Sequence, residues 1–302
     1  MSKYKSILLE LMANKSQWSQ LKEELSNTYN VRDTDSGKYD SSAGKIFEEF
    51  TKYYFLASPT EKDNFKNVWL FEEAPASVRE VLNLGNQDYG VDLILEDHNS
   101  SYYVVQCKFR NDETSNLNWT TDKLANLFGF TSNAHGYIVF SNAANVDKVT
   151  KTRKDNFSFY GVSNLLEIDP QTFEAIYHLV AFNEYKPIPK LRPFEHQQIA
   201  IDACVSNFNS GYDRGQLILP CGAGKTLTAL WIKEELNAER TLVLVPSLAL
   251  LRQIKNEWQK QKADSYQYLC VCSESDIDNE AVDAVITHTY EVDTRVTTDP
   301  IV

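Results

Sequence analysis

Two spacings of apolar residues along the chain predict its helices and strands. Over residues 4–27 apolar side chains recur every three or four positions, with Lys and Glu between them, which predicts one amphipathic helix. Compact runs of β-branched, aromatic and aliphatic residues predict strands. Within residues 1–182, strands are predicted at 68–71, 91–95, 102–109, 136–140 and 157–162. Further helices are predicted at 43–56, 77–84, 120–128, 143–154 and 171–182.

The pattern changes at residues 183–193, NEYKPIPKLRP. Three prolines in eleven residues predict a semi-rigid linker, and the chain of 302 residues is long enough for a domain on each side. Beyond the linker, strands are predicted at 216–219, 241–247 and 285–290, and helices at 226–236 and 248–261.

The first predicted hairpin brings three polar side chains together. Its polar loop is centred near Asn99, so antiparallel pairing places Asp92 opposite Gln106. Because side chains alternate along a strand, Gln106 and Lys108 share one face, whereas Cys107 points to the other. A carboxylate can hold Mg²⁺, and a nearby lysine can position the attacking water, which suits phosphodiester hydrolysis. The same short pattern also fits a surface hairpin whose polar residues face water.

These residues carry a resemblance to a nuclease family. The sequences G-V-D-L at 90–93 and V-V-Q-C-K-F at 104–109 resemble the Mrr-type branch of the PD-(D/E)xK nucleases, in which glutamine often replaces the middle acid. That branch also carries a helix with G-x-x-F-E, which is present here at 44–48. The resemblance implies an α/β, restriction-endonuclease-like fold of order αβββαβ that uses Mg²⁺. It also implies four catalytic residues, Glu48, Asp92, Gln106 and Lys108, of which Glu48 and Asp92 bind the metal.

Two more carboxylates lie near this pattern. Helix neighbours are about 100° apart, so only one of Glu48 and Glu49 can face the site. The family pattern favours Glu48, and Glu49 is expected to face solvent. Asp88, in the turn before Asp92, is interpreted as a loop residue, with a role as a metal helper as the alternative.

A second candidate site follows the predicted strand at 216–219. There the sequence G-A-G-K-T opens a predicted helix, which is the context that a phosphate-binding loop needs. The amides of such a loop face phosphate oxygens. Lys225 would reach the β- and γ-phosphates of ATP, and the Thr226 hydroxyl would bind Mg²⁺. The alternative is a chance glycine-rich turn. The residues of the loop are Gly222, Ala223, Gly224, Lys225 and Thr226.

The segments around this loop resemble those of superfamily 2 helicases. In these enzymes the backbone of the next strand and loop, here near Pro246 and Ser247, grips one strand of nucleic acid. Upstream, 191–197 resembles the segment that reads adenine, which implies Gln197 as the base contact. The third predicted strand, 285–290, ends in the Thr-Tyr typical of the next helicase segment. The resemblance implies a RecA-like P-loop domain.

One motif of the helicase family is absent from the sequence. Neither D-E-x-H nor D-E-x-D occurs in the 302 residues, and no second motor lobe follows. We therefore expect a partial RecA-like domain with little ATPase activity, in an N-terminal fragment of a larger protein. A nuclease followed by a helicase resembles the front of type ISP restriction–modification enzymes. No methyltransferase motif is present, so modification is not inferred.

Charge and composition limit the expected partners. The net charge of −12 opposes a protein that coats DNA, so contacts with DNA are expected from local basic patches. Two candidate patches are Lys108 with Arg110, and the group Lys148, Lys151, Arg153 and Lys154, for which an ordinary solvated surface is the alternative. Five cysteines without framework spacing indicate the reducing cytoplasm. No apolar run approaches the roughly 18 residues that span a membrane.

Together these features predict a Mg²⁺-dependent DNA endonuclease of restriction type, coupled to an ATP-dependent translocase or helicase on double-stranded DNA. The alternative is a nuclease fold retained as a DNA-binding module, beside a half-motor that binds nucleotide without turnover. The expected domains are an N-terminal helical extension (1–42), the nuclease (43–182), the linker (183–193) and the first part of the helicase domain (194–302).

Overall fold

The computed structural model describes residues 2–29, 42–86, 89–147, 150, 156–266, 268–271 and 296–297. Within these residues the chain forms two compact units, which divide between Pro187 and Ile188 inside the proline-rich segment. Each unit is considered by itself. The strand predicted at 285–290, the acid Asp88 and the basic group at 148–154 lie outside the described residues.

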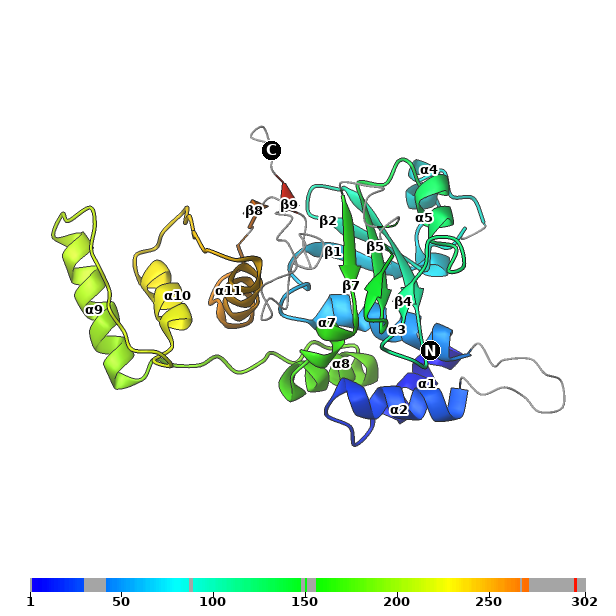
Figure 1. Cartoon of the computed structure of the whole chain (residues 1–302), viewed down its shortest axis with the longest axis horizontal. Helices are drawn as coiled ribbons and strands as arrows, with labels where there is room; N and C mark the ends of the chain where they lie inside the picture. The colour runs from blue at the N-terminus through cyan, green and yellow to red at the C-terminus, as the bar shows by residue number, and fades with distance from the viewer. Residues whose placement is uncertain are drawn as a thin grey trace. The chain divides into compact units, whose positions relative to one another are not determined.

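A five-stranded mixed sheet forms the centre of the first unit (Figure 1). Strands β1, β2 and β3 are antiparallel neighbours, and β5 and β7 continue the sheet in parallel with β3. Two short strands, β4 (Asn116–Leu117) and β6 (Asn145–Val146), pair with each other outside it. The sheet strands are β1 (Phe65–Leu70), β2 (Leu93–Asp97), β3 (Tyr102–Lys108), β5 (Gly136–Ser141) and β7 (Phe157–Tyr160).

Helices cover both faces of this sheet, so alternate residues of a strand enter two different cores. Val105 packs with one group of helices, and its neighbour Val104 packs with the other. The first group is α1 (Lys3–Met12), α2 (Trp18–Tyr29), α3 (Ser42–Ala57), α7 (Val162–Leu166) and α8 (Pro170–Phe182). The second is the short η1 (Phe71–Glu73), α4 (Ala76–Val81) and α5 (Leu124–Phe130).

The order α3, β1, β2, β3, α5, β5 confirms the predicted αβββαβ arrangement. Strand β5 is buried along its whole length because it has a hydrogen-bonded neighbour on each edge and helices on each face. The apolar run of β5, GYIVFS, is therefore the pattern that a doubly covered strand requires.

Three predicted elements of this unit differ from the structure. The single helix predicted over 4–27 is wrong, because the chain breaks into α1 and α2 around Asn14, whose φ is +64°. Strand β1 begins at Phe65 rather than at residue 68. The helix predicted at 143–154 is wrong at its start, where the chain forms β6. Apolar periodicity continues across a turn, so it does not mark where a helix ends.

The second unit is built on three helices, α9 (Glu195–Asn209), α10 (Lys225–Glu235) and α11 (Leu248–Gln261). The strands predicted at 216–219 and 241–247 are not formed, and Ile218, Leu242 and Leu244 are 79–83% exposed. A strand needs a hydrogen-bonded neighbour, and no described segment pairs with either stretch. The last two strands, β8 (Cys270–Val271) and β9 (Val296–Thr297), form a two-residue parallel pair that belongs to the first unit rather than to this one.

None of the helices within the described ranges is both long and apolar enough to cross a membrane.

Candidate nuclease site and phosphate loop

The register of the hairpin places Asp92 beside Gln106. Leu93 pairs with Val105, and the Asp92 N–H continues the ladder by donating to the Val105 carbonyl oxygen (2.8 Å). The Cys107 N–H then donates to Asp92 Oδ2 (2.7 Å). These backbone bonds hold the Asp92 carboxylate against the end of β3, in the register that a loop centred near Asn99 predicts.

Gln106 is buried with one polar atom unsatisfied. Its side chain is on the opposite face of β3 from Cys107, which packs with the helices around α3. The Oε1 atom of Gln106 is buried and has no hydrogen-bond partner among the described residues. The space for this amide depends on Gly90, because a Cβ atom there would lie 2.9 Å from Gln106 Nε2.

Glu48 projects from α3 toward the same end of the sheet. Its carboxylate is buried, and Oε2 accepts a hydrogen bond from Lys45 Nζ at 2.8 Å. Burial raises the pKa of Glu48 to about 8, the negative charge of Asp92 adds to the rise, and Lys45 opposes it. The two carboxylates are therefore close enough to repel each other.

Lys108, at the end of β3, is half-buried. Burial lowers the pKa of its ammonium group, the attraction of Asp92 opposes this, and the repulsion of Arg110 and Lys123 adds to it. A lysine whose pKa is lowered exchanges protons more readily near neutral pH than an exposed one.

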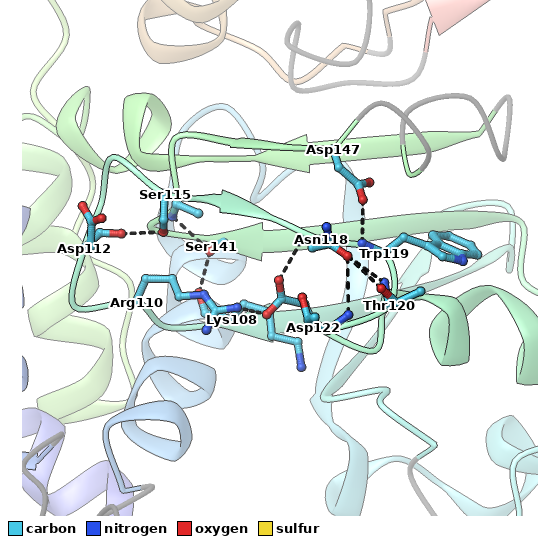
Figure 2. Close-up of polar contacts among 12 residues, drawn as sticks. Lys108, Arg110, Asp112, Ser115, Asn118, Trp119, Thr120, Asp122, Ser141 and Asp147 are labelled. Carbon is cyan, nitrogen blue, oxygen red and sulfur yellow. Dashed lines mark hydrogen bonds and ion pairs between the residues drawn. The ribbon is translucent and has the colours of Figure 1, made fainter.

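The backbone after Lys108 is held by polar contacts (Figure 2). Ser141 Oγ donates to the Lys108 carbonyl oxygen (2.6 Å). The buried Asn142 side chain accepts from the Arg110 N–H (2.6 Å) and donates to the Arg110 carbonyl oxygen (2.7 Å). Arg110 also forms an ion pair with Asp122. The backbone at Lys108 is therefore held by the strand β3 before it and by these side-chain hydrogen bonds after it.

Two residues near this site were not predicted as part of it. Lys45 lies one helical turn before Glu48, and Glu72 in η1 interacts electrostatically with both. The i, i+3 spacing of Lys45 and Glu48 is the signal that could have identified the lysine. The expectation for Glu49 is wrong: it is buried, and it accepts a hydrogen bond from the Ser2 hydroxyl, which belongs to the N-cap of α1.

The donor set of this site fits a hard divalent cation. It consists of the Glu48 and Asp92 carboxylates and the unsatisfied Oε1 of Gln106, and such cations prefer oxygen ligands. In the described part of the chain no cluster of three or more His, Cys, Asp or Glu side chains has metal-binding geometry. Besides the two carboxylates, the amide oxygen of Gln106 is a candidate third protein donor for such a cation.

The phosphate loop is the second candidate site. Gly222 and Gly224 have φ values of +78° and +75°, which L-residues rarely adopt, and α10 begins at Lys225. Lys225 is exposed, and its ammonium donates to the Pro220 carbonyl oxygen of its own loop (2.9 Å). The loop, the helix N-terminus and an accessible lysine fit a nucleotide phosphate. Trp258 Nε1 of α11 donates to the Thr226 carbonyl oxygen (2.8 Å).

Gln197 lies directly against this loop. Its Nε2 donates to the Ala223 carbonyl oxygen (2.9 Å), and its Oε1 accepts from the Phe194 N–H (2.8 Å). Both ends of the amide are thus bonded within the protein, and contact with a base would replace one of these bonds. Ser247 accepts from the Leu250 N–H (3.3 Å) as the N-cap of α11.

Comparisons with known proteins match two parts of the chain to two different families. Residues 56–156 match the family Mrr_cat_2, described as restriction endonuclease. Residues 190–297 match the family ResIII, described as type III restriction enzyme, res subunit. No curated protein matches the chain.

Among solved structures, the chain is similar to an ATP-dependent type ISP restriction–modification enzyme, LlaBIII, bound to DNA. The TM-score is 0.67 at 22% identity, over 94% of this chain and 17% of that chain. The chain thus spans about a sixth of the length of that enzyme. The fold and the family matches together define a restriction-endonuclease domain joined to a helicase-type domain with a RecA-like P-loop.

Proposed function

We propose that the first unit is a Mg²⁺-dependent endonuclease that cuts double-stranded DNA. Glu48 and Asp92 repel each other, and the hairpin register sets Gln106 beside Asp92. The observation that carries this proposal is the Oε1 atom of Gln106, which is buried and unsatisfied. Such a polar atom costs free energy unless it is satisfied, and a cation bound by both carboxylates would satisfy it.

Each residue would have a defined part in hydrolysis. Glu48, Asp92 and Gln106 would hold the cation, which supplies charge stabilisation at the phosphate and acidifies an attacking water. Lys108 would orient that water and take part in moving its proton, for which its lowered pKa is suited. Ser141 and Asn142 would position Lys108 through their hydrogen bonds to the backbone of Lys108 and Arg110.

We further propose that the second unit binds ATP and belongs to a motor that moves along duplex DNA. Lys225 and Thr226 would contact the phosphates and their Mg²⁺, and Gln197 would contact the base. The ResIII match, the loop geometry and the likeness to a DNA-bound type ISP enzyme support this assignment.

Cleavage of supercoiled plasmid tests the nuclease. The chain should nick plasmid in Mg²⁺ but not in EDTA, and Asp92→Asn and Lys108→Met should each lower the rate by roughly 100-fold or more. Lys66→Met is the matched control, because Lys66 is an exposed lysine on β1. Circular dichroism should show the same fold for all four proteins. Cleavage that persists at the wild-type rate in both site variants would refute the assignment.

One observation favours a second candidate, a nuclease fold that binds DNA without cutting it. An amide is a weaker ligand than a carboxylate, and the described residues contain no group of three or more His, Cys, Asp or Glu side chains that could hold a metal ion. In that case a gel shift would show binding to duplex DNA, and no divalent cation would bring about nicking.

A further inference from the structure

The positively charged side chain of Lys45 lies at the proposed nuclease site. Its Nζ lies 2.8 Å from Glu48 Oε2, and its charge also interacts with Asp92 and Glu72. Lys45 thus contacts Glu48 and is attracted by Asp92, the two acids that are proposed to hold Mg²⁺. The side chain of Lys45 is 45% exposed, whereas that of Glu48 is 12% exposed. The lysine can therefore move into solvent, and the glutamate cannot.

We propose that Lys45 is the resident counter-ion of this site, which holds Glu48 in the absence of metal and gives way when a divalent cation binds. The inference rests on the proposed nuclease site. Lys45 would set the cation concentration that the enzyme needs rather than its maximal rate, so it is a positioning residue and not a catalytic one.

The physical reason is the competition of two positive charges for one buried carboxylate. A divalent cation bound between Glu48 and Asp92 would repel an ammonium held at the same carboxylate, and the low dielectric of a buried site strengthens the repulsion. Glu72 is exposed and already attracts Lys45, so it offers the displaced ammonium a second carboxylate. Moving a flexible lysine costs less than moving a buried glutamate.

The chain offers a matched control for this lysine. Lys52 is on the same helix two turns later, and it also pairs with a glutamate, Glu73, at 2.6 and 2.7 Å. Glu73 also accepts a hydrogen bond from the Leu70 N–H, and it is not a residue of the proposed metal site. A divalent cation at Glu48 and Asp92 should leave the Lys52 pair unchanged.

The experiment combines calorimetry with lysine acylation followed by mass spectrometry. Calorimetry should show Mg²⁺ binding to the wild-type chain and none to Asp92→Asn. On saturation with Mg²⁺, acylation of Lys45 should accelerate roughly tenfold because its ammonium is released from Glu48. Acylation of Lys52 should not change, and Asp92→Asn should show no acceleration at Lys45.

A second variant tests the competition directly. At pH 9, where protons compete weakly for Glu48, Lys45→Met should bind Mg²⁺ roughly tenfold more tightly than wild type, whereas Lys45→Arg should bind as wild type does. Tight Asp92-dependent binding of Mg²⁺ without faster acylation of Lys45, or with unchanged affinity in Lys45→Met, would overturn the counter-ion role and leave the nuclease assignment standing. Absence of Asp92-dependent binding would overturn both.

Discussion

The two units respond differently to similar apolar sequences. In the first, GYIVF becomes the buried strand β5, with a neighbour on each edge. In the second, the comparable run TLVLV at 241–245 stays outside any strand, with Leu242 and Leu244 each 83% exposed. Helices form in both units because their hydrogen bonds are internal to one segment. Strands form only where another segment supplies the second half of each bond.

The two candidate sites share one local device. In each, a glycine with positive φ makes room for the amide of a glutamine: Gly90 for Gln106, and Gly224 for Gln197. The amides differ in their bonding. Gln106 Oε1 is unsatisfied, whereas both ends of Gln197 are bonded to the backbone. Gln106 Oε1 therefore keeps an unused acceptor, whereas the amide of Gln197 is tied to the phosphate loop by its bond to Ala223.

Truncation of a core side chain should show the largest difference between the units. Phe140 is fully buried against the rings of Phe47 and Tyr54, at centroid distances of 5.6 and 5.1 Å. Phe140→Ala should lower the stability of the first unit by about 3–5 kcal/mol, and Leu244→Ala should change stability by less than about 0.5 kcal/mol. Hydrogen exchange in increasing urea measures each unit separately. A large loss from Leu244→Ala would show that its segment is packed.

Loss of the phosphate-loop lysine should separate the two sites. Lys225→Ala should weaken ATP binding by roughly 50-fold, because a charged hydrogen bond to phosphate contributes about 2–3 kcal/mol. Mg²⁺ binding at Asp92 should not change. Fluorescent ATP titration and calorimetry measure the two affinities. Lys233→Ala is the control, since Lys233 is in the last turn of α10 and stacks on Tyr266. Equal losses in both variants would contradict the assignment of the loop.

The pH dependence of stability should report Glu48. Its pKa is about 8 in the folded chain against an ordinary value of 4.5. Between these pH values the folded protein binds more protons than the unfolded chain, so this carboxyl makes stability fall as the pH rises. In EDTA, Glu48→Gln should gain up to about 4 kcal/mol over wild type between pH 5 and pH 9. Urea unfolding across this range measures it, and parallel pH profiles would contradict a buried, repelled carboxyl.

The smallest effects should come from the two glycines. Gly90→Ala and Gly224→Ala should each cost about 1 kcal/mol, because each adds a Cβ at positive φ against a glutamine amide. Gly90→Ala should weaken Mg²⁺ binding severalfold and spare nucleotide, and Gly224→Ala should do the reverse. Gly129→Ala is the control, because its added Cβ would meet no atom within 4 Å. Crossed effects would show that the two sites are coupled.

The sequence by itself determined the order of the central elements of the first unit and the pairing at its site, but not the break between α1 and α2. The alternation of Gln106, Cys107 and Lys108 and the position of the hairpin loop were enough to place Asp92 beside Gln106, because register follows from where a hairpin turns. The G-A-G-K-T sequence likewise predicted the loop that opens α10, since its glycines supply the positive φ values that the turn requires.

Only the tertiary structure decided which charges meet. Lys45, Glu72 and Asp92 are distant in the sequence, and α3, η1 and the residue before β2 must come together before their charges interact. Glu49 is buried and bonded to Ser2 because α1 packs against α3. No local sequence pattern predicts that packing. The exposed runs of the second unit have the same cause: the sequence specifies that a segment is apolar, but a strand exists only where a partner from elsewhere in the chain completes its hydrogen bonds.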